Sequence, residues 1–217
     1  MLASHKSFDE HLTVGWNAAL AERLGLNIAG AVCLKGYKGD AERKIGLVAR
    51  VVGRLRMEEM VGRIRGEFGG AGELFGGRED VEEQEVAVVA IMNAFHAEEV
   101  ERVLQVVREA GWFSDAIDGQ SVLYLTGAAR ELGLEAAKKV NMSTYCVGHR
   151  ACEEWGIKYL ARQTELRWPV LNVVTVLEEE EPPPPKVKHK APEAIEEQNS
   201  QVSKGSTNVS CSTNSSL

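Results

Sequence analysis

The chain has 217 residues, 44% of them hydrophobic, which is enough for one domain of ordinary size with a buried core and additional segments. Its 32 acidic residues outnumber the 25 basic ones, and the formal net charge of −7 argues against direct binding to nucleic acid. No apolar signal core follows Met1, and no run approaches the roughly 18 apolar residues of a membrane span. We therefore expect no membrane association and a cytoplasmic location, with the nucleus and the mitochondrion as open alternatives.

The front third of the chain is predicted to contain two helices and a strand. Residues 14–25 show the amphipathic pattern of a helix that ends at Gly25, and residues 56–69 show a second helical pattern. Between them, the β-branched run 45–52 predicts a strand. The glycine-rich stretch 68–77 invites comparison with a phosphate-binding loop, but it lacks the lysine and hydroxyl residue that such loops use. We interpret it as a flexible connector.

Strands and helices are predicted to alternate in the middle of the chain. The apolar runs 86–92, 121–127 and 143–149 are each followed by a helical pattern, and the run 170–177 predicts a closing strand. Such alternation is typical of βαβ units. We therefore predict an α/β fold with a parallel or mixed sheet covered by helices.

The sequence changes character after Leu177. Four consecutive prolines follow a run of glutamates, and the end of the chain is rich in serine and asparagine. Because this composition offers almost no apolar side chains to bury, we predict a domain over residues 1–177 and a disordered tail over residues 178–217.

The four cysteines show neither CxxC spacing nor the density of a disulfide-rich protein. They are predicted to be reduced thiols in small buried or half-buried positions. They stand at Cys33, Cys146, Cys152 and Cys211.

The stretch "CVGHRACEEWG" places His149 four residues before Glu153, at the end of a predicted strand. An imidazole and a carboxylate at this spacing share one face of a helix and can bind one cation. A carboxylate in the first turn of a helix is also favoured by the helix dipole, so the pair can equally be a polar joint. A third ligand from another segment would decide for a metal. The segment "HKSFDEH" offers His5, Asp9 and His11, although Asp9 can also cap the first helix.

Three blocks of the chain resemble, in order and spacing, the Nif-three family (NGG-one-interacting factor three), whose members are also labelled GTP cyclohydrolase I type 2-like. The resemblance covers residues 5 to about 178. The matching residues are His5 to Asp9 followed by Asn17 to Ala21, then Thr126 and Gly127, then Gly148, His149 and Glu153.

The resemblance implies an α/β fold, a ring-like homo-oligomer and a site for a pair of divalent metal ions. It assigns ligand roles to Asp9, His149 and Glu153 in this chain. Oxygen and imidazole ligands suit zinc, iron or manganese and leave coordination positions open for water. With three ligands we expect at most a single, weakly bound ion, and the sequence gives no cofactor-binding residue beyond these.

The chain also departs from the family pattern. The family has an earlier His-His segment that supplies further metal ligands, and we expect the domain to be N-terminally incomplete because this chain begins after it. Where the family places an acidic residue and a histidine after Thr-Gly, this chain has Ala128 and Leu132, which cannot move a proton. The family's glycine-rich turn after the first central strand is replaced by "NAFHAEE", where we expect His96 to start a helix.

Three interpretations stay open from the sequence. The chain is a metal-dependent hydrolase-like protein, a family member that has lost catalysis and serves as an interaction or regulatory protein with protein partners, or a shortened gene product. We favour a metal-binding member of the family with reduced catalytic ability. Its catalytic residues and substrate are unknown from the sequence.

Overall fold

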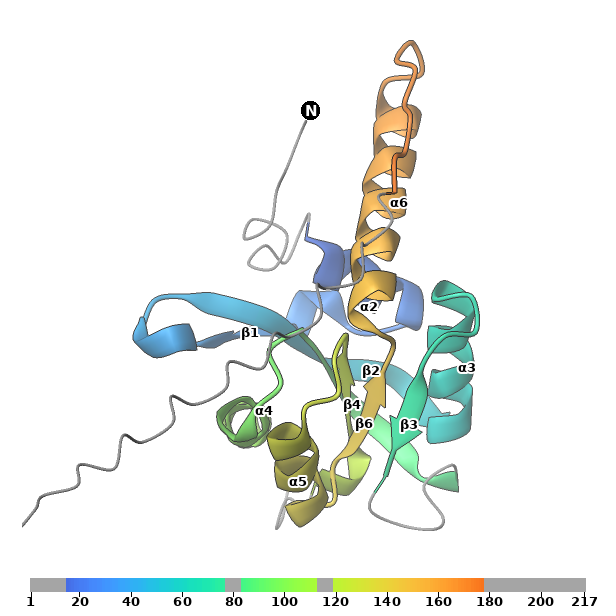
Figure 1. The fold of residues 1–217 in the computed structure, drawn as a ribbon. Coiled ribbons are helices and arrows are strands. Elements are labelled where there is room, and N and C mark those ends of the chain that lie inside the picture. Colours follow the sequence, from blue (N-terminus) through green and yellow to red (C-terminus); the bar gives the residue numbers. More distant parts are fainter. Residues whose placement is uncertain (1–14, 77–82, 113–118, 178–217) are drawn as a thin grey trace, which may run out of the picture. The chain divides into compact units, whose positions relative to one another are not determined.

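The computed structural model describes residues 15–76, 83–112 and 119–177, which are drawn in colour in Figure 1. The chain divides into two units, with the boundary between Leu177 and Glu178. The tail lies outside the described residues, as does Cys211, so its predicted disorder stays a prediction. Within the described ranges, no helix has the length and apolar character needed to cross a membrane.

A six-stranded mixed sheet forms the centre of the described unit, with the strand order β1-β2-β4-β5-β6-β3. Three neighbouring strands, β4, β5 and β6, run parallel, whereas the remaining pairings are antiparallel. The strands are β1 (Val32–Lys35), β2 (Lys44–Arg56), β3 (Glu73–Phe75), β4 (Glu85–Ile91), β5 (Val122–Thr126) and β6 (Ser143–Cys146). This arrangement confirms the predicted α/β class and selects the mixed form of the sheet.

Five α-helices accompany the sheet in the part of the chain that the structure describes. They are α2 (Trp16–Leu24), α3 (Met57–Glu67), α4 (Ala97–Glu109), α5 (Glu131–Lys139) and α6 (His149–Arg167). Helix α2 ends, as predicted, at Gly25, which has a φ of 81°. Its left-handed conformation is one that residues with a side chain rarely adopt.

The sheet is buried on both faces by two separate apolar clusters. Helices α2 and α3 pack with Leu123 on one face, and helices α4 and α5 pack with Tyr124 on the other. Alternate residues of a strand point to opposite faces, so neighbouring residues of β5 enter different clusters. This explains why all five residues of β5 are buried and why its sequence is a continuous apolar run rather than an alternating one.

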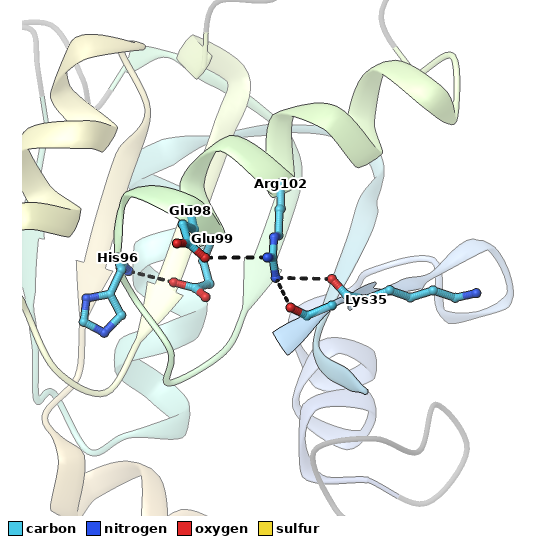
Figure 2. Close-up of polar contacts among 6 residues, drawn as sticks. Lys35, His96, Glu98, Glu99 and Arg102 are labelled. Atoms are coloured by element: carbon cyan, nitrogen blue, oxygen red, sulfur yellow. Dashed lines mark hydrogen bonds and ion pairs between the residues drawn. The ribbon is translucent and has the colours of Figure 1, made fainter. Parts of the chain in front are cut away.

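Helix α4 is held at its start and against the β1 edge by the contacts drawn in Figure 2. The backbone N–H of His96 donates to the Glu99 carboxylate at 3.1 Å, which confirms His96 as the helix-start residue. Arg102 donates to the carbonyl oxygens of Lys35 at 3.3 Å and Gly36 at 2.8 Å. Arg102 therefore joins the middle of α4 to the end of β1.

Three local predictions were wrong or incomplete. The run 170–177 forms no strand, because β-propensity alone does not create one without a neighbouring strand to pair with. The stretch 68–77 contains β3, whose three residues pair with β6 and are too few to give a periodic pattern. Strand β1 was not predicted, because its four residues have two buried positions between two exposed ones and show no alternation.

Helix α6 is docked on the α2–α3 side of the sheet by one close contact and one shared carboxylate. Gly156 is the one buried residue among those of α6, and a Cβ atom there would overlap the indole ring of Trp16. The Glu67 carboxylate accepts hydrogen bonds from Arg23 at 2.6 Å and from the Trp155 indole at 3.1 Å. Glu67 thus joins residues of α2, α3 and α6.

Replacing Gly156 by alanine is expected to lower the free energy of unfolding by about 1–3 kcal/mol, because the added methyl group cannot fit beside Trp16. Alanine is the better helix former, so the substitution would be stabilising if only propensity mattered. Urea denaturation followed by circular dichroism measures the change.

Gly62→Ala is the matched control for this experiment. Gly62 also lies inside a helix, α3, but it is exposed and an added Cβ meets no atom within 4 Å. This variant is expected to raise the free energy of unfolding by up to about 1 kcal/mol. If Gly156→Ala and Gly62→Ala raised the free energy of unfolding equally, the close packing of Trp16 on Gly156 would be contradicted.

Candidate functional site

The carboxyl ends of the parallel strands β4, β5 and β6 lie together at one edge of the sheet. Helices α4 and α5 leave this edge toward one face, whereas the first turns of α6 pack, through Cys152 and Trp155, on the cluster of the other face. Figure 1 shows α6 beginning where β6 ends. The helices that follow β5 and β6 therefore lie on opposite faces of the sheet, and ligands of open α/β sheets bind between two such strands.

Gly127, directly after β5, is the point of closest approach at this edge. Its N–H donates to the Asn93 side-chain oxygen at 3.1 Å, and its carbonyl oxygen accepts from the Cys146 thiol at 3.4 Å. A Cβ at Gly127 would lie 2.5 Å from that Asn93 oxygen, 3.2 Å from the Cys152 sulfur and 3.4 Å from the His149 Cα. The absence of a side chain at Gly127 lets the start of α6 come this close to β5.

A second glycine sets the direction of α6. Gly148 has a φ of 94° and precedes the first helical residue, His149. The Gly148 carbonyl accepts the N–H of Cys152 at 3.2 Å, which begins the helical hydrogen bonding. The sequence "GH" is thus a turn followed by the first residue of a helix.

His149 and Glu153 are brought together as the spacing predicts. The His149 Nε2 and the Glu153 Oε1 atoms are 3.0 Å apart, with side chains 60% and 50% exposed. At 3.0 Å the two atoms are at hydrogen-bonding distance, which is shorter than the roughly 3.3–3.6 Å between tetrahedral ligand atoms of a zinc ion with bonds of about 2.0–2.2 Å. The pair supplies an imidazole nitrogen and a carboxylate oxygen, which are atoms of the kinds that bind divalent metals.

Glu153 lies one turn further into the helix than predicted. Helix α6 begins at His149 and has no acidic residue in its first turn. The attraction between a carboxylate and the helix dipole falls off beyond the first turn. The helix dipole therefore stabilises the Glu153 carboxylate less than the sequence suggested. The contact with His149 is the stronger interaction of this carboxylate.

The described residues contain no group of three or more His, Cys, Asp or Glu side chains that could hold a metal ion. Asp9, like His5 and His11, lies outside those residues, so its ligand role stays a prediction. The pair His149 and Glu153 is the part of the predicted ligand set that the structure places.

The two cysteines beside the pair, Cys146 and Cys152, are free thiols and half-buried, as is expected of reduced cysteines, and the described Cys33 is buried. Burial raises the pKa of the Cys152 thiol to about 12, with smaller contributions from Cys146 and Glu153. At neutral pH the Cys152 thiol is therefore protonated, and a protonated thiol is a poor nucleophile.

Two residues that depart from the family pattern lie on the loop and helix after β5. Ala128 is half-buried, and Leu132 is a large apolar side chain with 67% of its surface exposed. Next to them, the Arg130 guanidinium lies 2.8 Å from the His96 Nε2 atom. Arginine has no acceptor, so this nitrogen of His96 accepts the hydrogen bond. His96 is thereby paired with Arg130 rather than with His149.

Asn93 is the residue at this edge that sequence reasoning missed. It stands two residues after the end of β4 and is exposed. The signal was a polar side chain shortly after a buried strand, at the edge where ligands of parallel sheets bind. The sequence could not show that Asn93 faces Gly127, because this pairing depends on the register between β4 and β5.

The family model for Duf34/NIF3 (NGG1p interacting factor 3) matches residues 1–183 of the chain. The chain belongs to this family. The resemblance read from three short blocks is therefore confirmed, and the match extends beyond the last described residue. None of the curated proteins matches the chain.

Solved structures of similar fold support the same assignment of fold. Protein ybgI is 20% identical over 75% of this chain with a TM-score of 0.52. Reduced HcgD from Methanocaldococcus jannaschii is 17% identical over 75% of the chain with a TM-score of 0.53. Staphylococcus aureus protein SA1388 is 14% identical over 76% with a TM-score of 0.50. This NIF3-family chain spans 55%, 55% and 62% of the length of those chains, respectively.

Gly127→Ala is expected to lower the free energy of unfolding by about 1–3 kcal/mol, because its Cβ would press against the Asn93 oxygen and the start of α6. Combining it with Asn93→Ala removes the nearest of these atoms. The double variant is therefore expected to lose less than the sum of the two single losses, as contacting residues do not behave additively. Strict additivity in urea denaturation would show that the two residues do not touch.

Proposed function

We propose that the protein is a divalent-metal-binding member of the Duf34/NIF3 family with reduced catalytic ability. The observation that supports this most directly is that the His149 imidazole and the Glu153 carboxylate lie together at the sheet edge where α5 and α6 diverge. Both side chains are half exposed, so an ion can reach them from solvent. We propose zinc, iron or manganese, since all three accept imidazole and carboxylate ligands.

Asp9 is proposed as the third ligand. Trp16, the first residue of α2, packs against Gly156 of α6, seven residues beyond His149. Seven helical residues span about 10 Å, whereas the seven-residue step from Asp9 to Trp16 can reach up to about 25 Å. The chain between Asp9 and Trp16 is therefore long enough for Asp9 to serve as the third ligand, which supports the proposal.

A bound divalent ion supplies Lewis acidity and can activate water. The chain's own residues provide its ligands, but the positions that the family uses for proton transfer hold Ala128 and Leu132. Neither side chain can give or take a proton. His96, the residue before α4, accepts a hydrogen bond at its Nε2 from Arg130. These observations support the proposal that this member of a hydrolase-related family has reduced catalytic ability.

Titration calorimetry with zinc or manganese tests the metal proposal. The wild-type chain is expected to bind at most one ion per chain, and His149→Ala and Glu153→Gln should each weaken binding by roughly tenfold or more, because each removes one of three ligands. Glu154→Gln is the matched control. Its carboxyl, whose pKa is lowered by hydrogen bonds from Arg150 and Lys158, has neighbours outside the ligand pair.

The control variant is expected to bind metal within about twofold of wild type, since surface ion pairs of this kind contribute little. If the His149 and Glu153 variants both bound metal with wild-type affinity, the pair would be a structural ion pair and not a set of metal ligands. Two tightly bound ions per wild-type chain would show that other residues complete a dinuclear site.

A second candidate function, as an interaction protein and homo-oligomer, is favoured by the surface after α6. The β-branched side chains of Val170, Val174 and Val176 are 93%, 71% and 72% exposed. They belong to the run that the sequence predicted to be a strand. Exposed apolar side chains gathered in one segment are typical of protein–protein contact sites, and an unpaired extended run can add to the sheet edge of another molecule.

Replacing both Val174 and Val176 by lysine tests this second function. If the run 170–177 joins subunits, the double variant is expected to sediment as a smaller species than wild type in analytical ultracentrifugation, because charges cannot be buried unpaired in an interface. Thermal unfolding of the variant should stay close to wild type, since both side chains are exposed. An unchanged sedimentation coefficient would exclude these two residues from any subunit contact.

A further inference from the structure

The run 170–177, drawn in orange beyond the end of α6 in Figure 1, has a backbone without a pairing partner among the described residues. The Leu171 N–H donates to the Trp168 carbonyl oxygen at 2.9 Å and forms a turn after the helix. Beyond this turn, residues 172–177 make no hydrogen bond to any other residue that the structure describes. Each of them carries an N–H donor and a carbonyl acceptor. The run therefore offers a strand edge to another chain.

The exposure of the side chains alternates along the run, as it does in a strand with one outward face. Val170, Val174 and Val176 are 93%, 71% and 72% exposed, whereas Leu177 is 37% exposed and Val173 is half-buried. A period of two residues is that of extended backbone, and β-branched side chains favour strands. The run thus has the side chains and the backbone of a strand that lacks a neighbour.

The charges that flank the run favour an antiparallel partner of the same sequence. Arg167, the last residue of α6, is exposed and makes no ion pair with another described residue. After the run, residues 178–181 are all glutamates. Two parallel copies would place these glutamates side by side, and like charges opposite one another are destabilising. Two antiparallel copies place the glutamates of one chain beside Arg167 of the other.

We propose that the run 170–177 pairs in antiparallel fashion with the same run of a second copy of this chain, about a two-fold axis at Val173. The inference rests on the interaction function proposed above as the second candidate, and it names the partner and the register. Opposite residues of an antiparallel pair point to the same face, so in a symmetric pair a central residue must stand opposite its own copy. With Val173 at the axis, Val170 stands opposite Val176, and Arg167 opposite Glu179. The exposed valines of one chain are then covered by those of the other.

Cysteine cross-linking of the full-length chain tests this register. In Val173→Cys the two new thiols face each other across the axis, where the Cα atoms of opposite residues are about 4.5–5.5 Å apart, within the range of a disulfide. Oxidation with glutathione disulfide is expected to link the chains through residue 173, as shown by mass spectrometry of the linked peptides. Val170→Cys is the matched control, because its two copies lie about 20 Å apart along the paired strands and should stay unlinked.

Arg167→Glu tests the charge argument without a new cysteine. The substitution places a glutamate opposite Glu179 at both ends of the symmetric pair. The dissociation constant of the dimer, measured by analytical ultracentrifugation, is therefore expected to rise roughly tenfold or more. Arg162→Glu is its control, since Arg162 lies earlier in α6 and pairs with Glu165 at 3.6 Å. It changes the net charge equally and should change the dissociation constant by less than about twofold.

The outcomes separate the inference from the function on which it rests. A wild-type chain that stays monomeric at every concentration would overturn the second candidate function together with the inference. An oligomeric wild type in which Val173→Cys and Val170→Cys link equally, or not at all, would overturn only the inference. Thermal unfolding shows whether each variant is folded. Should Val173→Cys fail to fold, equal dissociation constants of the two arginine variants would overturn the inference.

Discussion

The burial of the parallel strands β4, β5 and β6 on both faces is the constraint on which the rest of the structure depends. Parallel strands need crossover connections, and α4 and α5 supply them on one face. The opposite face must then be covered by elements from other parts of the chain, here α2, α3 and the start of α6. For this reason α6, which follows β6, lies on the opposite face from α4 and α5. The candidate site lies at the edge of the sheet where these helices diverge.

Two glycines make this placement of α6 sterically possible. Gly148 turns the chain from β6 into α6 with a φ of 94°, and Gly127 leaves room for α6 to begin against the end of β5. A third glycine, Gly156, lies further along α6 and leaves room for the Trp16 ring to pack against the helix. Helix α6 is thus positioned by these glycines together with the packing of Cys152 and Trp155 and the hydrogen bond from Trp155 to Glu67.

The exposure of the proposed ligands has consequences for their chemistry. A half-exposed imidazole and carboxylate are well hydrated, so little desolvation accompanies ion binding and little electrostatic strength is gained from a low dielectric. Such a site exchanges its ion readily unless further ligands close it. The same unit also exposes large apolar side chains after α6 and at Leu132.

The sequence by itself determined the parts of this protein that depend on local order. The periodicity of residues 16–24 and 97–109, the apolar runs of the central strands and the spacing of His149 and Glu153 are set by neighbours within a few residues, so they could be predicted. Family membership followed from the order of three such local motifs. The tertiary structure alone decided the strand order, the pairing of Asn93 with Gly127 and the exposure of residues 170–177. These features depend on which distant segments pack together, and β-propensity cannot supply a neighbour for a strand that has none.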